Sequence, residues 1–116
     1  MNKKTVGFVG VGNIGTPMVL SLLRAGFDVL VRDLNKDQAK EVINAGARFA
    51  GSNEQLTQEC DVIGVTVVND AQLTSLFSSA GGLLESARKG TTLIVHSTVL
   101  PKTILALGTE ADAKGL

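Results

Sequence analysis

The chain has 116 residues, of which 44% are hydrophobic and 19% charged, and its formal net charge is zero. This length and apolar content suit one domain with a substantial core, whereas zero net charge and 3% aromatic residues give no support for a nucleic-acid partner. No apolar run approaches the length of a membrane-spanning helix. The single cysteine, Cys60, cannot form an internal disulfide, which fits a reducing cytosol. We therefore expect a cytoplasmic protein with no nucleic-acid or membrane partner.

Apolar strand patterns alternate with amphipathic helix patterns along the sequence. Strands are expected at residues 5–9, 29–31, 48–50, 62–67 and 92–95. Helices are expected at 13–25, between Asn35 and Gly46, from Ser52 to near Glu59, after Asp70 as far as Gly81, and at 103–113. The alternation predicts an α/β fold, a Rossmann-type doubly wound parallel sheet in three α/β/α layers.

Several helix starts carry capping signals. Asn35 with Gln38, and Ser52 with Gln55, have the spacing of capping boxes, and Asp70 is expected to cap the fourth helix. In the first helix, the spacing of four apolar residues predicts one buried face, formed by Ile14, Met18, Leu22 and Ala25.

Three glycines, Gly10, Gly12 and Gly15, follow the first strand at G-x-G-x-x-G spacing, with Asn13 and Ile14 between them. The first allows a tight exit from the strand, the second lets a pyrophosphate approach the main chain, and the third lets the helix pack on the strand. The helix start offers N–H groups and a positive dipole end to phosphates. With no G-K-[ST] following, the pattern favours a dinucleotide over a triphosphate. The alternative is a glycine-rich turn that binds no ligand.

An acidic residue, Asp33, follows the second strand. Its carboxylate can accept hydrogen bonds from both ribose hydroxyls of NAD and would repel the 2′-phosphate of NADP. Arg32 could instead pair with a phosphate or stack on adenine. We expect NAD rather than NADP, and the alternative for Asp33 is a turn residue before the next helix.

Open parallel sheets bind ligands outside the carboxyl ends of their strands. Val67 and Val68 follow the fourth strand, and Ser97 and Thr98 follow the fifth. We expect these residues to line one cleft with the glycine turn and with the segment 32–34. No spacing of His, Cys, Asp or Glu side chains predicts a metal site.

The segments 7–18, 25–26 and 33 resemble the opening of the β-hydroxyacid dehydrogenases, which reads G-F-I-G-L-G-x-M-G-x-P-M, then A-G, then an acidic residue or Asn. Pro17 and Met18 after the third glycine make the match specific, and 97–101 resembles the family segment S-T-x-x-P. The resemblance implies a substrate that is a small hydroxy acid, such as 3-hydroxyisobutyrate, or a semialdehyde. It places the substrate carboxylate at Ser97 and the nicotinamide near Thr98.

The chain also departs from this family. Val67 and Val68 replace a Leu-Pro pair, Val95 replaces an aspartate, and Leu34 lies where NADP-preferring relatives carry arginine, which again favours NAD. The family's catalytic lysine and its C-terminal helical domain lie beyond residue 116. The resemblance therefore implies that 1–116 is a dinucleotide-binding domain cut before its last strand, that it holds no catalytic residue, and that the full-length protein forms homo-oligomers.

Two other functions remain open: the cofactor domain of an imine reductase, and a non-catalytic NAD(H)-sensing module. His96, the only histidine, is expected at the ligand-facing end of a strand, in a structural or cofactor-edge role rather than as the catalytic acid–base group. Cys60 is expected to be a partly buried structural residue.

Overall fold

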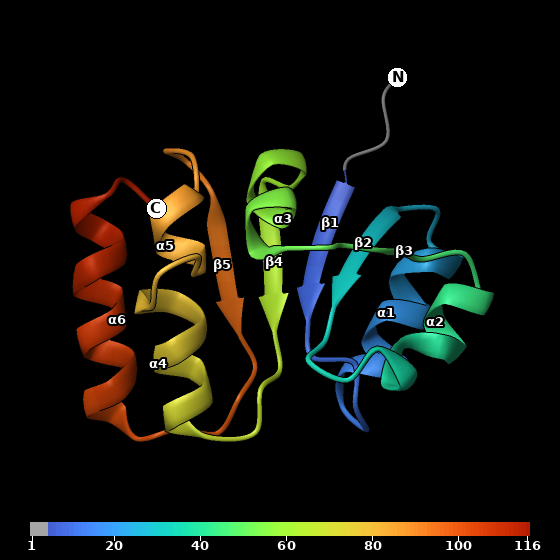
Figure 1. Cartoon of the computed structure of the whole chain (residues 1–116), viewed down its shortest axis with the longest axis horizontal. Helices are drawn as coiled ribbons and strands as arrows, with labels where there is room; N and C mark the ends of the chain where they lie inside the picture. The colour runs from blue at the N-terminus through green and yellow to red at the C-terminus, as the bar shows by residue number, and fades with distance from the viewer. Residues whose placement is uncertain (1–4) are drawn as a thin grey trace.

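The computed structural model describes residues 5–116. Its centre is a parallel sheet in the order β3-β2-β1-β4-β5 (Figure 1). The strands are β1 (Thr5–Val9), β2 (Asp28–Arg32), β3 (Arg48–Phe49), β4 (Val62–Val65) and β5 (Thr92–Val95). The chain runs outward from β1 in one direction and then returns to start β4 on its other side, so the strand order reverses between β1 and β4. The predicted doubly wound parallel fold is confirmed.

Helices cover both faces of the sheet, which confirms the three-layer arrangement. One face carries α1 (Gly15–Arg24), the 3₁₀ turn η1 (Lys36–Ala39) and α2 (Lys40–Asn44). The other carries α3 (Asn53–Glu59), α4 (Asp70–Ser78), α5 (Leu83–Ser86) and α6 (Pro101–Ala113) (Figure 1). None of the helices in the described part of the chain is long and apolar enough to cross a membrane.

Alternating strand residues supply the two cores. Phe8 of β1, with Val29 and Val31 of β2, faces α1 and α2. Val9 and Leu30 face the other way, toward α3 and α4. This alternation is the two-residue period of a strand buried on both sides, so the loops at the carboxyl ends of β1 and β2 start from strands packed on both faces.

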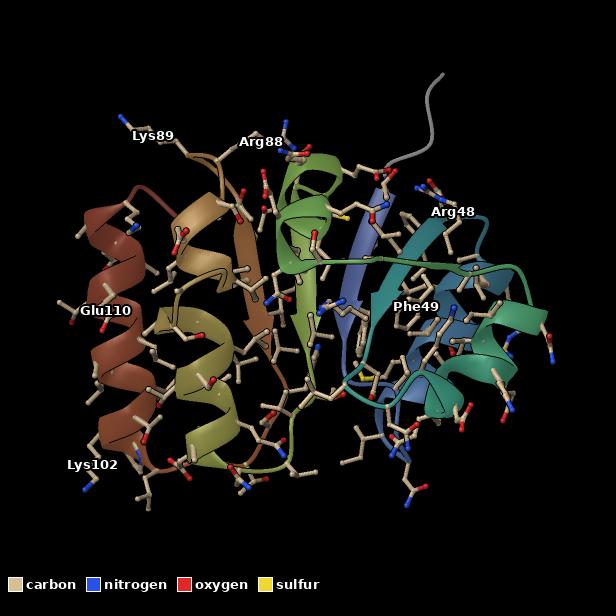
Figure 2. All side chains as sticks on the ribbon, viewed as in Figure 1. Arg48, Phe49, Arg88, Lys89, Lys102 and Glu110 are labelled. Carbon is tan, nitrogen blue, oxygen red and sulfur yellow. The ribbon has the colours of Figure 1, made fainter. Side chains whose placement is uncertain are left out.

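An ion-pair cluster lies at the short edge strand β3, which pairs with β2 in the sheet. Arg48 donates to the Asp28 carboxylate at 2.7 Å and to Glu59 at 3.1 Å. Figure 2 shows Arg48 at the end of the sheet where the strands begin. All three side chains are more than one-third exposed, so each pair contributes below about 1 kcal/mol. The cluster therefore orients β3 without dominating its stability.

Some predicted boundaries and caps were wrong. The fourth strand ends at Val65 instead of residue 67, and the helix α5 was not predicted. The cap of α4 is Asn69, whose side chain accepts from the Gln72 N–H, so Asp70 is the first helical residue rather than the cap.

The two predicted capping boxes differ in outcome. Ser52 accepts from the Gln55 N–H as expected, although Gln55 Oε1 accepts from the Gly51 N–H instead of the Ser52 N–H. The Asn35 side chain accepts from the Asp37 N–H, because the first turn there is 3₁₀. The Gln38 N–H donates to the Asn35 backbone carbonyl at 3.1 Å instead of to its side chain.

The predicted buried face of α1 was partly wrong. Ile14 precedes the helix as its N-cap residue and is 66% exposed, whereas Val19 is fully buried. Met18 and Leu22 are only partly buried and pack against the core, and Ala25 is exposed. The helix begins two residues later than expected, so Ile14 lies outside it.

The sheet face beside α1 is only half covered. Within residues 5–116, no helix lies over the α1 side of β4 and β5, and Ile94 of β5 is 43% exposed there. Right-handed crossovers explain this, because they place the helices that follow β4 and β5 on the opposite face. A shallow apolar recess of about 540 Å³ results, with Phe8, Leu22 and Ile94 among its lining residues.

Candidate functional site

The glycine turn lies at the carboxyl end of β1, where the strand order reverses. Gly10 has φ +92°, and a Cβ there would lie 2.5 Å from the Thr66 carbonyl oxygen. A Cβ on Gly15 would lie 2.0 Å from the Gly10 carbonyl oxygen. A Cβ on Gly12 would meet only the Gln38 side chain, at 3.4 Å. The first and third glycines are therefore required by the fold, while the absent side chain of Gly12 keeps the main chain open toward the cleft.

The carbonyl groups of Gly10, Val11 and Gly12 are bound within the chain. Thr66 Oγ1 donates to the Gly10 carbonyl at 2.6 Å, Thr16 Oγ1 donates to the Val11 carbonyl at 2.6 Å, and the Thr16 N–H donates to the Gly12 carbonyl at 3.0 Å. In the described part of the chain, the N–H groups of Gly12, Asn13 and Ile14 have no acceptor. The turn thus presents donors at the positive end of α1, which is an arrangement that binds phosphate.

Asp33 lies directly across from the turn. Its Oδ2 accepts from the Val11 N–H at 2.9 Å, and its Oδ1 accepts from the Asn35 N–H at 2.8 Å. The bond from the Asn35 N–H gives Asp33 the role of a turn residue, which was the alternative prediction for this side chain. Each carboxylate oxygen can accept more than one hydrogen bond, so the same side chain keeps capacity for hydroxyl groups of a ligand.

A cleft of about 300 Å³ joins these segments. It includes six of the predicted cofactor residues: Gly10, Gly12, Asp33, Leu34, Val67 and Val68. It also includes Thr66, Gln38 and Gln72, which the sequence analysis missed. Asn13 lines a more open depression on the other side of Gly12, again with Gln38 and Val68.

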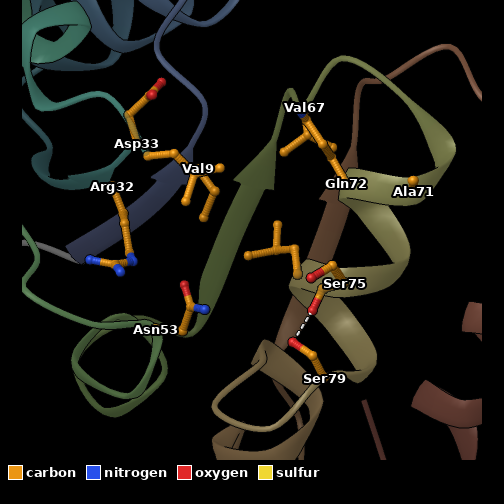
Figure 3. Close-up of a pocket in the computed structure, with 11 residues that line it drawn as sticks. Val9, Arg32, Asp33, Asn53, Val67, Ala71, Gln72, Ser75 and Ser79 are labelled. Atoms are coloured by element: carbon orange, nitrogen blue, oxygen red, sulfur yellow. Dashed lines mark hydrogen bonds between the residues drawn. The ribbon is translucent and has the colours of Figure 1, made fainter.

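A second hollow of about 350 Å³ continues the cleft between β2 and α4 (Figure 3). It shares Asp33, Leu34 and Val67 with the cleft and extends to Arg32 and Asn53. In Figure 3 the side chains of Arg32 and Asp33 point in opposite directions. Arg32 Nη1 donates to the Ala50 carbonyl at 3.2 Å. Arg32 therefore lies in this hollow, and the Asp33 carboxylate has no cationic partner in the part of the chain that the structure describes.

The loop after β4 is held by side chains of α4. The Val68 N–H, which a proline would lack, donates to Gln72 Oε1 at 3.1 Å. The Val68 side chain is 77% exposed and forms part of the cleft wall. The valine that replaces the family's proline thus provides an N–H that helps to hold this loop.

Ser97 and Thr98 do not line the cleft or its continuation. They follow β5, where Ser97 Oγ is buried without a hydrogen-bond partner and Thr98 is exposed. The expectation that the loop after β5 shares one cleft with the other three is wrong for these residues. Their loop is anchored by the His96 N–H, which donates to the Val65 carbonyl at 2.8 Å, and by the Leu100 N–H, which donates to Asp70 at 2.9 Å.

His96 and Cys60 lie outside the cleft. The His96 ring stacks on Phe8, with centroids 6.1 Å apart and planes 12° apart. Cys60 is fully buried, and burial raises the pKa of its thiol to about 12. Among the residues that the structure describes, no group of three or more His, Cys, Asp or Glu side chains could hold a metal ion.

A parallel sheet whose order reverses beside a glycine turn, with a carboxylate at the end of the next strand, defines a dinucleotide-binding domain. Residues 5–116 match the family model described as the NAD binding domain of 6-phosphogluconate dehydrogenase, and the chain belongs to that family.

Curated relatives of the chain are oxidoreductases. The mitochondrial 3-hydroxyisobutyrate dehydrogenase of Bos taurus is 32% identical over 114 residues, which are 98% of this chain and 34% of the relative. The 2-(hydroxymethyl)glutarate dehydrogenase of Eubacterium barkeri is 29% identical over 96% of this chain and 37% of its own length. The chain thus spans about one-third of the relatives that it matches.

Solved structures share the fold closely. A 3-hydroxyisobutyrate dehydrogenase from Salmonella typhimurium has a TM-score of 0.88 at 27% identity over 98% of this chain and 40% of its own. Psf3, solved with NADP⁺, has a TM-score of 0.91 at 26% identity over 95% of this chain and 39% of its own. An imine reductase from Pseudomonas sp. reaches 0.81 at 22% identity, over 96% of this chain and 38% of its own, which shows a common fold. Pyridine-nucleotide binding is thus supported, and the hydroxyacid dehydrogenase interpretation fits better than the imine reductase one.

Proposed function

We propose that the chain is the cofactor-binding part of a 3-hydroxyacid dehydrogenase that acts on a small hydroxy acid or semialdehyde. The observation that carries the proposal is the glycine turn with its outward N–H groups beside Asp33, in a chain 32% identical to a 3-hydroxyisobutyrate dehydrogenase. A bound nicotinamide dinucleotide supplies the hydride transfer, and the protein supplies orientation. The residues of the turn bind the pyrophosphate, and Asp33 binds the adenosine ribose.

We propose NAD as the preferred dinucleotide. Asp33 carries a negative charge where the 2′-phosphate of NADP would lie. Arg32 is engaged by Ala50 and points away, and Lys36 lies over the Phe49 ring at 5.3 Å. Leu34, next to the carboxylate, is 93% exposed and uncharged. None of these side chains offsets the repulsion between Asp33 and a phosphate.

Fluorescence titration of the chain with NADH and NADPH tests this preference. Wild type is expected to bind NADH more tightly. Asp33→Ala removes the repulsion and two internal hydrogen bonds, so NADH affinity falls and the ratio of NADPH to NADH affinity rises. Damage to the turn alone would lower both affinities and leave their ratio unchanged. Asp37→Asn, which removes an exposed carboxylate paired only with Lys40 at 3.4 Å, is the matched control. Tighter binding of NADPH by wild type would contradict the proposal.

The substrate side of the proposal involves Ser97 and Thr98. A hydroxyl with adjacent N–H groups at a strand end suits a small carboxylate, and Ser97 Oγ has no hydrogen-bond partner among residues 5–116. We assign no catalytic acid–base residue to residues 1–116 and propose that a further helical domain supplies it. The chain is accordingly expected to bind NADH without steady-state turnover of 3-hydroxyisobutyrate, and measurable turnover would refute this division of labour.

The remaining proposals concern the whole protein. We propose a cytoplasmic location, supported by the buried, unpaired thiol of Cys60, although the Bos taurus relative is mitochondrial. We also propose that the full-length protein is a homo-oligomer. Fractionation of the source cells and light scattering of the full-length protein test these two statements.

A further inference from the structure

The peptide group that joins Gly10 and Val11 is held at both ends. Its carbonyl oxygen accepts from Thr66 Oγ1 at 2.6 Å, and its N–H donates to Asp33 Oδ2 at 2.9 Å. No peptide bond in residues 5–116 is cis, so the two groups point in opposite directions. Asp33, which follows β2, and Thr66, which follows β4, therefore hold this peptide plane from opposite sides.

Thr66 is well placed to hold this plane. It is the first residue after β4, and its N–H donates to the Val9 carbonyl at 2.8 Å, which extends the pairing of β4 with β1. Its hydroxyl oxygen lies 2.9 Å from the position of a Cβ on Gly10 and 2.8 Å from that of a Cβ on Gly15. The hydroxyl is thus packed against the first and third glycines.

The orientation of this peptide decides which groups the turn presents. With the Gly10 carbonyl turned to Thr66, and the Val11 carbonyl turned to Thr16, carbonyl oxygens are kept away from the anion. If the Gly10 carbonyl were released, its partial negative charge could rotate toward the phosphate. The Val11 N–H would lose its direction toward Asp33 at the same time, because the two groups belong to one plane.

We propose that Thr66 is a positioning residue for the dinucleotide site, whose hydroxyl fixes the Gly10–Val11 peptide so that the turn presents N–H groups to the pyrophosphate and Val11 to Asp33. The inference rests on the dinucleotide binding proposed above. It predicts a coupling between Thr66 and Asp33, although the two side chains bind opposite ends of the peptide rather than each other.

The test compares Thr66→Val, which keeps the shape and removes the hydroxyl, with Thr66→Ser, which keeps the hydroxyl. NADH affinity is measured by fluorescence, and adenosine, which lacks the pyrophosphate, is titrated by NMR. Thr66→Val is expected to weaken NADH binding about five- to tenfold. Adenosine binding is expected to stay within about twofold, because the bond from the Asn35 N–H still holds the Asp33 carboxylate when the Val11 N–H is released. Thr66→Ser is expected to retain NADH affinity within about threefold. Thr74→Val, the same change at an exposed threonine of α4, is the control.

Amide hydrogen exchange gives a second measurement. The Val11 amide is expected to exchange faster in Thr66→Val than in wild type, although Thr66 does not bind that amide, and Thr66→Ser is expected to keep it slow. Unchanged NADH affinity and unchanged Val11 exchange in a folded Thr66→Val would overturn the inference. Equal losses of NADH and adenosine affinity would also overturn it, because they would assign Thr66 a general structural role. Failure of Thr66→Val and Thr66→Ala to fold while Thr66→Ser folds would do the same. Absence of NADH binding by wild type would instead refute the proposed function.

Discussion

Thr103 of α6 donates its hydroxyl hydrogen bond to the carboxylate of Asp70, the first residue of α4, over 2.6 Å. The same oxygen, Oδ2, accepts from the Leu100 N–H at 2.9 Å, so Asp70 caps the start of α6 from a neighbouring helix. The loop between β5 and α6, which carries Ser97 and Thr98, is therefore fixed at its far end by a side chain 30 residues away.

Removal of the Asp70 carboxylate is expected to lower the melting temperature. The Thr103 hydroxyl and the Leu100 N–H hold the pKa of Asp70 below its usual range. Because the folded pKa is lower than the unfolded pKa of about 3.9, the stabilisation is present above pH 4 and is lost as the pH falls through the folded value. Thermal unfolding of wild type and Asp70→Asn measures this, and the difference in melting temperature should shrink as the pH is lowered from 6 toward 2.

Asp112→Asn is the control for this prediction, since the Asp112 side chain makes no hydrogen bond or ion pair in the described structure. It is expected to change the melting temperature little. A difference between wild type and Asp70→Asn that persists undiminished at the lowest pH would contradict the assignment.

Two glycines at helical positions offer a matched pair. A Cβ on Gly15 would lie 2.0 Å from the Gly10 carbonyl oxygen, whereas a Cβ on Gly108 of α6 would meet nothing within 4 Å. Gly15→Ala is expected to cost about 1–3 kcal/mol by overpacking and to abolish NADH binding. Gly108→Ala is expected to add about 0.5–1 kcal/mol, because alanine favours the helix.

Urea unfolding and NADH titration of both variants provide the measurement. Both substitutions add one methyl group. Opposite changes in the free energy of unfolding would therefore be due to the different space around each glycine. Retention of wild-type stability and NADH affinity by Gly15→Ala would show that the turn can shift freely, contrary to its packed geometry.

The sequence predicted those features that depend on local pattern. The strands at 5–9 and 92–95 have the predicted bounds, because their apolar runs end at turn residues. The glycine turn and Asp33 were found because their spacing reports backbone geometry that few other residues permit. The role of Thr66 had no such signal, since it depends on β4 lying beside β1, and a single threonine after an apolar run fits many structures.

The cap of α6 was missed for the same reason. Asp70 has the position of a helix cap in the sequence, and its true partners, Leu100 and Thr103, are distant along the chain. Ile14 was expected to be buried because apolar periodicity does not report where a helix begins, and its exposure follows from its place before the first helical residue. A tertiary contact decided the first of these cases, and the start of the helix decided the second.

Cys60 is expected to be inert in the folded chain. Burial raises the pKa of its thiol to about 12, and the side chain is fully buried. The thiol therefore stays protonated at pH 8, and the protonated form is a poor nucleophile. A disulfide reagent that reports free thiols should therefore react slowly with native protein and at once in denaturant, with the denatured chain as the control. Rapid reaction of the native chain would mean that β4 opens readily at its start.

Helices cover one face of β4 and β5 but not the other. Alanine substitution of one isoleucine on each face is therefore expected to lower the free energy of unfolding by different amounts. Ile63 of β4 is fully buried beneath the helices of one face, whereas Ile94 of β5 is 43% exposed on the other. Ile63→Ala is expected to cost about 2–5 kcal/mol through lost burial and the cavity left behind. Ile94→Ala is expected to cost less than about 1 kcal/mol, because water already reaches the side chain.

Urea unfolding at several protein concentrations measures both costs. If Ile94→Ala proved as costly as Ile63→Ala, something would cover the recess beside α1 in solution. A cost that rose with protein concentration would identify the cover as a second copy of the chain, because only association makes apparent stability depend on concentration. A small, concentration-independent cost for Ile94→Ala is the result that the structure of the single chain requires.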